Sequence, residues 1–96
     1  MAQAATVENF DELIQGPLTI VDFWAPWCGP CKMMEPIMAE LEKEFEGQIK
    51  FVKFNVDHRQ AIAERYKVMS VPSLVLFRNG VAKEKVTGIY PKDRLA

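Results

Sequence analysis

Cys28 and Cys31 are the two residues of this chain best suited to do chemistry. Two cysteines separated by two residues and wound onto a first helical turn bring their sulfur atoms within disulfide range. The chain has no further cysteine, whereas a protein that uses disulfides for stability normally carries several, spaced further apart. The spacing therefore favours redox chemistry or metal binding.

The expected position of Cys28 favours its ionised form. A predicted strand at residues 18–24 ends just before it, and a predicted helix at residues 28–45 begins with it. Lowering the pKa of an ordinary thiol from ~8.5 by about 1.5 units needs roughly 2 kcal/mol. Because a helix N-terminus supplies typically ~0.3–1 kcal/mol, we expect a hydrogen bond from the partner thiol to add to it.

A cysteine pair has three other common uses in proteins: a zinc site, haem attachment and a structural disulfide. Zinc usually takes four ligands, and the chain offers one histidine, His58, and no second cysteine pair. Haem attachment would need histidine where Lys32 stands. A structural disulfide would close a loop too small to stabilise much. A redox pair is favoured, with the zinc site and the structural disulfide as alternatives.

Charge and hydropathy exclude several classes of partner. Lys plus Arg total 12 and Asp plus Glu total 13, so a net charge of −1 gives no electrostatic case for nucleic acid or an anionic membrane. No apolar run approaches the ~20 residues that span a bilayer. The first ten residues lack the charged and apolar regions of a secretory signal, so a cytoplasmic location is expected.

Hydrophobic periodicity predicts alternating helices and strands. Helices are expected at residues 7–15, 28–45 and 57–66 and from Pro91 onward, and strands at 18–24, 49–56, 73–77 and 81–86; the residues before Thr6 allow one more short strand. Asp57 is expected to cap the third helix, with Gln60 as its capping-box partner. Asn79-Gly80 favours a tight hairpin turn, so the last two strands should pair antiparallel. This order predicts an α/β sandwich with a mixed central sheet.

Asp22 is an acidic residue in the middle of an apolar strand. Side chains alternate along a strand, so Asp22 shares a face with Ile20 and Trp24 and should be partly desolvated, which raises its pKa. It is interpreted either as a functional acid or as a strand-end aspartate paired with a lysine.

Residues 21–32, with the run Trp27-Cys28-Gly29-Pro30-Cys31-Lys32, closely resemble the active-site segment of the thioredoxin family. The resemblance covers nearly the whole chain and continues through Pro36, Lys53, Asp57, Val71-Pro72, Asn79-Gly80 and Gly88. It implies one thioredoxin-like domain over residues 1–96, a three-layer α/β/α sandwich with an antiparallel C-terminal hairpin. Gly29-Pro30 is similar to the reductase version of the motif, since related oxidases and isomerases commonly carry histidine there.

The resemblance also implies roles. Cys28 would attack a substrate disulfide, and Cys31 would be the buried thiol that resolves the mixed disulfide. An exposed Cys28 beside a shielded Cys31 would fit that order. Asp22 would exchange a proton with Cys31, and Lys53 would be the charge partner of Asp22.

The family match implies a docking surface for substrates as well. The Val71–Pro72 peptide bond would be cis, and the backbone of Val71 would pair with an extended substrate segment. The surface would comprise Trp27, Gly29, Pro30, Val71, Pro72, Gly88 and Ile89.

The function expected from this resemblance is the reduction of protein disulfides by dithiol–disulfide exchange. The partners would be disulfide-containing proteins and a thioredoxin reductase that recycles the oxidised form. The cysteine pair would be the redox group, with no bound cofactor or metal. Two alternatives remain: a binding module that uses the same apolar surface without redox chemistry, and a disulfide oxidase or isomerase.

The end of the chain departs from the family pattern. The helix that begins at Pro91 reaches only Ala96, so it is expected to be truncated. One sheet face would then be less covered, and strand residues such as Val75 and Phe77 would be exposed.

Overall fold

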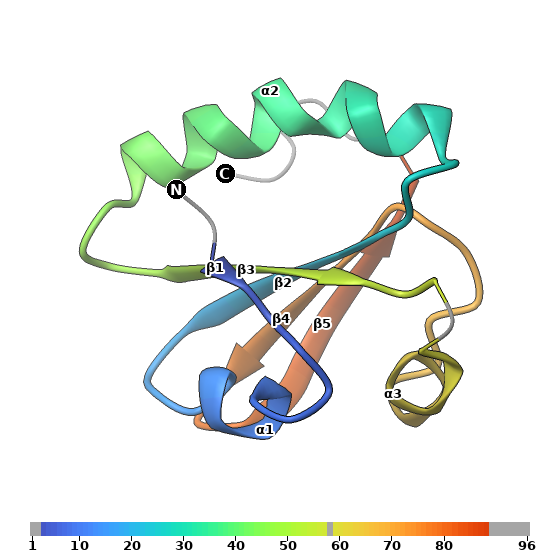
Figure 1. The fold of residues 1–96 in the computed structure, drawn as a ribbon. Coiled ribbons are helices and arrows are strands. Elements are labelled where there is room, and N and C mark those ends of the chain that lie inside the picture. Colours follow the sequence, from blue (N-terminus) through green and yellow to red (C-terminus); the bar gives the residue numbers. More distant parts are fainter. Residues whose placement is uncertain (1–2, 58, 89–96) are drawn as a thin grey trace.

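The computed structural model describes residues 3–57 and 59–88, which form a five-stranded sheet between two layers of helices. The elements are β1 (Gln3–Ala4), α1 (Phe10–Leu13), β2 (Thr19–Trp24), α2 (Gly29–Glu44), β3 (Lys50–Asn55), α3 (Gln60–Arg65), β4 (Ser73–Arg78) and β5 (Val81–Thr87). Helix α2 lies over one face of the sheet, and α1 and α3 lie against the other (Figure 1). The predicted three-layer α/β/α sandwich is confirmed. Ile89 and the helix expected from Pro91 lie outside the described residues.

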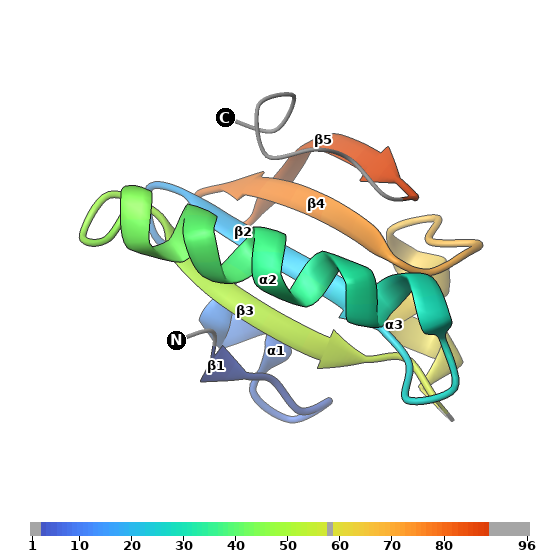
Figure 2. The same ribbon diagram turned by 90° about the horizontal axis from the view of Figure 1, so that it is seen from above.

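Strand β2 lies in the centre of the sheet, whose strand order is β1-β3-β2-β4-β5. It pairs parallel with β3 and antiparallel with β4, and α2 crosses over this central region (Figure 2). A central strand is covered on both faces, which explains why β2 is mostly apolar. It also explains why Asp22, one of its few polar residues, is buried.

The hairpin between β4 and β5 forms as the Asn79-Gly80 pair predicts. Both residues have positive φ angles, 52° at Asn79 and 85° at Gly80. Two consecutive positive φ angles match the twist of antiparallel strands, and Arg78 pairs with Val81 across the turn.

The face of the sheet toward α1 and α3 carries an aromatic core. The rings of Phe10, Phe23, Phe54 and Phe77 are fully buried. Phe10 contacts the other three at centroid distances of 5.2–6.2 Å and so anchors the short α1 to the sheet. The expectation that Val75 and Phe77 would be exposed is wrong, because both belong to this core, at 1% and 0% exposure.

The opposite face packs against α2 through Met34, Met38 and Leu41, which form a cluster with Phe51 and Leu74. A groove of about 490 Å³ remains open on this side, lined in part by Ile20, Phe45 and Leu76. Among residues 3–57 and 59–88, the apolar surface that is incompletely covered therefore lies on the α2 side, since alternation turns Leu74 and Leu76 away from Val75 and Phe77.

Two helix boundaries differ from the sequence prediction. Helix α1 has four residues instead of nine, preceded by a turn in which Thr6 and Asn9 exchange side-chain to backbone hydrogen bonds. Helix α3 begins at Gln60 with Arg59 as its N-cap, and the Arg59 side chain makes no capping hydrogen bond. The prediction of Asp57 as N-cap is wrong, because Arg59 holds that position; the backbone N–H of Asp57 donates to the Asn55 side chain at 2.8 Å. Across the described residues no helix is both long and apolar enough to cross a membrane.

Candidate active site

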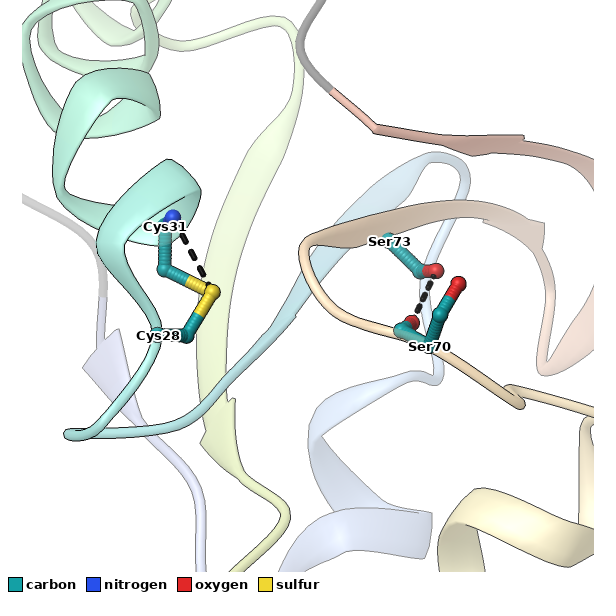
Figure 3. Close-up of a disulfide and its surroundings, with 4 residues drawn as sticks. All are labelled: Cys28, Cys31, Ser70 and Ser73. Atoms are coloured by element: carbon teal, nitrogen blue, oxygen red, sulfur yellow. Dashed lines mark hydrogen bonds between the residues drawn. A yellow bond between two sulfur atoms is a disulfide. The ribbon is translucent and has the colours of Figure 1, made fainter.

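Cys28 and Cys31 form a disulfide at the point where the loop after β2 enters α2 (Figure 3). Their Cα atoms lie 5.3 Å apart, within the range that a disulfide requires. The predicted proximity of the two sulfur atoms is confirmed. One of the two residues is the N-cap of the helix and the other lies on its first turn.

Cys28 is the N-cap residue of α2. Its backbone is extended, at φ −92° and ψ 110°, and its Sγ accepts a hydrogen bond from the backbone N–H of Cys31 at 3.1 Å. A serine or aspartate oxygen usually accepts this bond at a helix N-terminus. In the reduced protein a thiolate at this position receives a backbone N–H donor and the positive end of the helix dipole, so the geometry favours ionised Cys28.

The two cysteines do not differ in exposure, contrary to the expectation of an exposed Cys28 beside a shielded Cys31. Each is 4% exposed in the disulfide form. They pack with Ala25 and are flanked by Trp24 and Val71, so that both sulfur atoms are covered. Gly29 and Pro30, by contrast, are exposed on the first turn of the helix. The order of attack is therefore supported by the N-cap position of Cys28 and not by exposure.

Asp22 lies on the face of β2 toward α2, where it is 4% exposed. Its Oδ1 has no hydrogen-bond partner among the described residues. Burial raises the pKa of Asp22 to about 6, the positive charge of Lys53 opposes this rise, and the negative charge of Glu35 adds to it. A carboxyl with this pKa can both accept and release a proton near neutral pH.

Lys53 is the register partner of Asp22 in the parallel pairing of β2 with β3. Its Nζ lies 4.8 Å from the ring centroid of Trp24, so the ammonium group contacts an aromatic face close to the acid. The sheet thus brings Lys53 into the surroundings of Asp22 as a neighbouring charge, with Trp24 next to it.

The loop before β4 carries the other predicted site residues. The Val71–Pro72 bond is cis, and Pro72 is buried. Val71 packs against the cysteine cluster, which brings this loop to the disulfide. Gly88 adjoins the same loop, because its backbone N–H donates to the carbonyl of Pro72 at 2.9 Å. Trp27 is 69% exposed beside the cysteines, and Ile89 lies outside the described residues.

Sequence reasoning missed the residues that hold this loop in shape. The hydroxyl of Ser73 donates to the carbonyl of Ser70 at 2.7 Å (Figure 3) and lies 3.3 Å from the hydroxyl of Thr87 on β5. Hydroxyl residues on either side of a proline, at the start of a predicted strand, are the signal that could have indicated such a bond.

The chemistry available here is thiol–disulfide exchange. A disulfide at a helix N-terminus, packed against the loop that carries Val71, is the site of a thiol–disulfide oxidoreductase. Within residues 3–57 and 59–88 no group of three histidine, cysteine or acidic side chains is placed to hold a metal ion.

Comparison with known proteins agrees with this class. The thioredoxin family model matches residues 1–96. A thioredoxin of Staphylococcus haemolyticus is 45% identical over 91 residues, which is 95% of this chain and 88% of that protein. A thioredoxin of Staphylococcus aureus is 43% identical over the same shares of the two chains.

Solved structures show the same fold. Mitochondrial thioredoxin 3 of Saccharomyces cerevisiae, in its oxidised form, superposes with a TM-score of 0.87 at 33% identity, over 98% of this chain and 90% of that one. A mutant thioredoxin of Halobacterium salinarum superposes with a TM-score of 0.86 at 35% identity, over 98% and 82% of the two chains. The chain belongs to the thioredoxin family, and its function is dithiol–disulfide exchange through Cys28 and Cys31.

Proposed function

We propose that this protein reduces disulfide bonds in other proteins, with Cys28 as the nucleophile, Cys31 as the resolving thiol and Asp22 as the group that takes the proton of Cys31. The observation that carries the proposal is the hydrogen bond from the Cys31 N–H to Sγ of Cys28 at the first turn of α2. The same donor is available to a thiolate, which is the attacking species in disulfide exchange.

In the first step the Cys28 thiolate attacks one sulfur atom of a substrate disulfide. A bond forms between Cys28 and that sulfur, and the other substrate sulfur leaves as a thiolate that takes up a proton. Gly29 and Pro30 present no bulky side chain toward the incoming substrate, and apart from its chain neighbours and the helix backbone no atom lies within 4 Å of the place where a Cβ of Gly29 would be.

In the second step Cys31 attacks Sγ of Cys28 and releases the reduced substrate. Cys31 must first lose its proton, and Asp22, with a pKa raised by burial to about 6, is largely ionised at neutral pH and can accept it. Lys53 moderates the affinity of Asp22 for that proton through its positive charge. Two substrate thiols and one Cys28–Cys31 disulfide result, so electrons and protons balance.

Substrates dock on the surface that surrounds the disulfide. One side of this surface consists of Trp27, Gly29 and Pro30. The other side consists of Val71, Pro72 and Gly88, and a hydrogen bond holds Gly88 to Pro72. We propose that an extended substrate segment pairs with the backbone of Val71, with Ile89 completing the surface. These assignments follow from the family resemblance and from the positions of the described residues around the cysteines.

The oxidised protein needs a source of electrons, and we assign this role to a thioredoxin reductase. The compartment proposed is the cytoplasm. Both cysteines belong to the redox pair, and the chain has no further cysteine for the stabilising disulfides that are common in oxidising compartments. The dithiol itself is the redox group, so no cofactor or metal is assigned.

The test is a comparison of Cys31→Ser with Cys28→Ser. Under mild oxidation Cys31→Ser should form mixed disulfides with proteins, because the first step proceeds and the second is blocked. Cys28→Ser is the matched control and should form none. Mixed disulfides that form in Cys28→Ser but not in Cys31→Ser would reverse the assigned order of attack.

Two further measurements separate the alternatives. Insulin reduction by dithiothreitol should be accelerated by the protein, and absence of acceleration would favour a binding module. The reduction potential of the Cys28–Cys31 pair should be strongly reducing, and a strongly oxidising value would favour an oxidase or isomerase.

A further inference from the structure

A groove of about 390 Å³ opens beside the cysteine pair. Its lining combines Trp27 and residues 68–71 with residues that precede or belong to α3: Val56, Asp57, Gln60, Ala63 and Glu64. Because the groove includes Trp27 and Val71, it is continuous with the docking surface proposed above.

Met69 is the most exposed large apolar side chain among the described residues, at 95%. Its neighbours anchor the segment: Val68 packs against the aromatic core, and Val71 packs against the cysteine cluster. Lys67, at a left-handed φ of 57°, turns the chain out of α3 into this segment. Met69 is thus held at the groove with its side chain in solvent, where it contributes no core packing.

An exposed thioether is open to oxidation, and the other described methionines allow a comparison. Met34 and Met38 are buried at 0% and 7% exposure. Met33 is 61% exposed on α2 and does not line the groove. Two described methionines are therefore accessible to an oxidant, and one of them, Met69, lines the groove that adjoins the proposed docking surface.

We propose that Met69 is a site of reversible oxidation to methionine sulfoxide that weakens substrate docking in this groove. The oxidant is a hydroperoxide: its O–O bond breaks, a bond forms between one oxygen and the sulfur of Met69, and the remainder leaves as water or an alcohol. The sulfur loses two electrons and the peroxide gains them. Methionine sulfoxide reductase reverses the change.

The effect on activity follows from polarity, and it rests on the proposed function because it requires substrates to dock here. A sulfoxide is polar, so an apolar substrate segment that covers it must remove its hydration. We expect the KM for a protein disulfide to rise roughly three- to tenfold on the cost of burying such a group, with kcat unchanged. A small disulfide that reaches Cys28 without filling the groove should be reduced at an unchanged rate.

The experiment uses the full chain in its disulfide form, in which the cysteines are protected, treated with hydrogen peroxide and then returned to the dithiol form. Mass spectrometry locates the added oxygen atoms. The treated-to-untreated ratio of KM is measured with insulin and with 5,5′-dithiobis(2-nitrobenzoate), for the unsubstituted protein, Met69→Leu and the matched control Met33→Leu. The ratio for insulin should rise in the unsubstituted protein and in Met33→Leu, stay near one in Met69→Leu, and return to one after methionine sulfoxide reductase treatment.

Three outcomes overturn the proposal. Met69 could remain unmodified while Met33 is oxidised, the insulin KM could stay constant with Met69 fully oxidised, or Met69→Leu could respond to peroxide as strongly as the unsubstituted protein. Failure of the proposed function gives a different result, since the untreated protein would then reduce neither disulfide.

Discussion

The two faces of β2 differ in what they bury: one buries apolar side chains and the other buries an acid. Toward α1 and α3, Val21 and Phe23 are fully buried in the aromatic core around Phe10. Toward α2, Asp22 is buried without a hydrogen-bond partner for its Oδ1 among the described residues, and Trp24 contacts the ammonium of Lys53. One face gains stability from apolar burial, and the other loses stability because it buries an acid whose pKa is raised.

The largest change in stability is expected from a substitution in the aromatic core toward α1 and α3. Phe10→Ala should lower the free energy of unfolding by about 3–5 kcal/mol, because it leaves a cavity among Phe23, Phe54 and Phe77 and frees a helix of only four residues. Urea unfolding monitored by circular dichroism checks this. If Phe10→Ala does not fold, Phe10→Leu should show a smaller loss of the same sign.

Val7→Ala is the control for this substitution, since Val7 precedes α1 and is 51% exposed. It should change stability by less than about 0.5 kcal/mol. Folded Phe10→Leu should reduce insulin at the normal rate, because Phe10 does not contact the cysteines. A slower reduction would show that the two faces are not independent.

The second prediction concerns Asp22, whose substitution should stabilise the protein above pH 6, whereas Phe10→Ala should destabilise it. The pKa of Asp22 is raised from 3.8 to about 6, so the folded protein holds this proton more tightly than the unfolded chain. The free energy of unfolding should therefore fall by about 3 kcal/mol as the pH rises from about 4 to above 6. Asp22→Asn should lack this decline and be more stable than the unsubstituted protein at pH 7 to 8.

Urea unfolding of the oxidised protein across this pH range measures the difference without titration of the cysteines. Glu46→Gln removes an exposed acid and is the control, with little change expected. The same Asp22→Asn variant should resolve mixed disulfides more slowly at pH 7, since Cys31 loses its proton acceptor. Equal stability of the two proteins at pH 8 would contradict a raised pKa at Asp22.

These two faces also show what the sequence could and could not predict. Alternation along residues 18–24 correctly placed Asp22 with Ile20 and Trp24, and the Cys-X-X-Cys spacing correctly placed two sulfur atoms together. Alternation states which residues share a face, but it does not state which helices cover that face. The prediction for Val75 and Phe77 failed for this reason, since it assigned them to the wrong layer.

The helix cap at Asp57 and the burial of the two cysteines were predicted less well, because both depend on contacts that hydrophobic periodicity does not describe. Asp57 has the sequence signature of an N-cap, but Asn55 binds its backbone and the helix begins later, at Gln60. The equal burial of Cys28 and Cys31 depends on Trp24 and Val71, which come from two different parts of the chain. The groove beside Met69 depends likewise on the packing of residues 68–71, which periodicity does not address.

A smaller effect is expected at Lys53. The charge of Lys53 lowers the pKa of Asp22, so Lys53→Met should raise that pKa further above about 6 while keeping an apolar side chain near Trp24. The cost at pH 7 should be about 1 kcal/mol of stability, as for a partly buried charge pair. The pH dependence of the resolving step should shift toward higher pH. An NMR titration of the Asp22 carboxyl carbon measures the pKa directly.

Lys83→Met is the control for this variant, because Lys83 is an exposed lysine on β5 of the same sheet. It removes one positive charge without removing the neighbour of Asp22. A pKa of Asp22 that moves equally in the two variants would show a general effect of net charge, and a downward shift in Lys53→Met would refute the assignment of Lys53.

The smallest change in the pKa of Asp22 is expected from substitution of Glu35, and its direction should be opposite to that in Lys53→Met. Glu35 is exposed on α2, and its negative charge adds to the rise in the pKa of Asp22. Glu35→Gln should lower that pKa slightly and so oppose the effect of Lys53→Met, with less than about a twofold change in the resolving rate near pH 6. Because Glu35 faces solvent, high salt should remove most of the difference between Glu35→Gln and the unsubstituted protein.

Glu40→Gln is the control, because Glu40 is an exposed acid on the same helix, and it should leave the pKa of Asp22 unchanged. If Glu40→Gln and Glu35→Gln shift it alike, the face toward α2 responds to the charge of the helix as a whole. If Glu35→Gln alone shifts it, the acid is tuned by one position next to the cysteine turn, and the two faces of β2 differ in electrostatics as well as in packing.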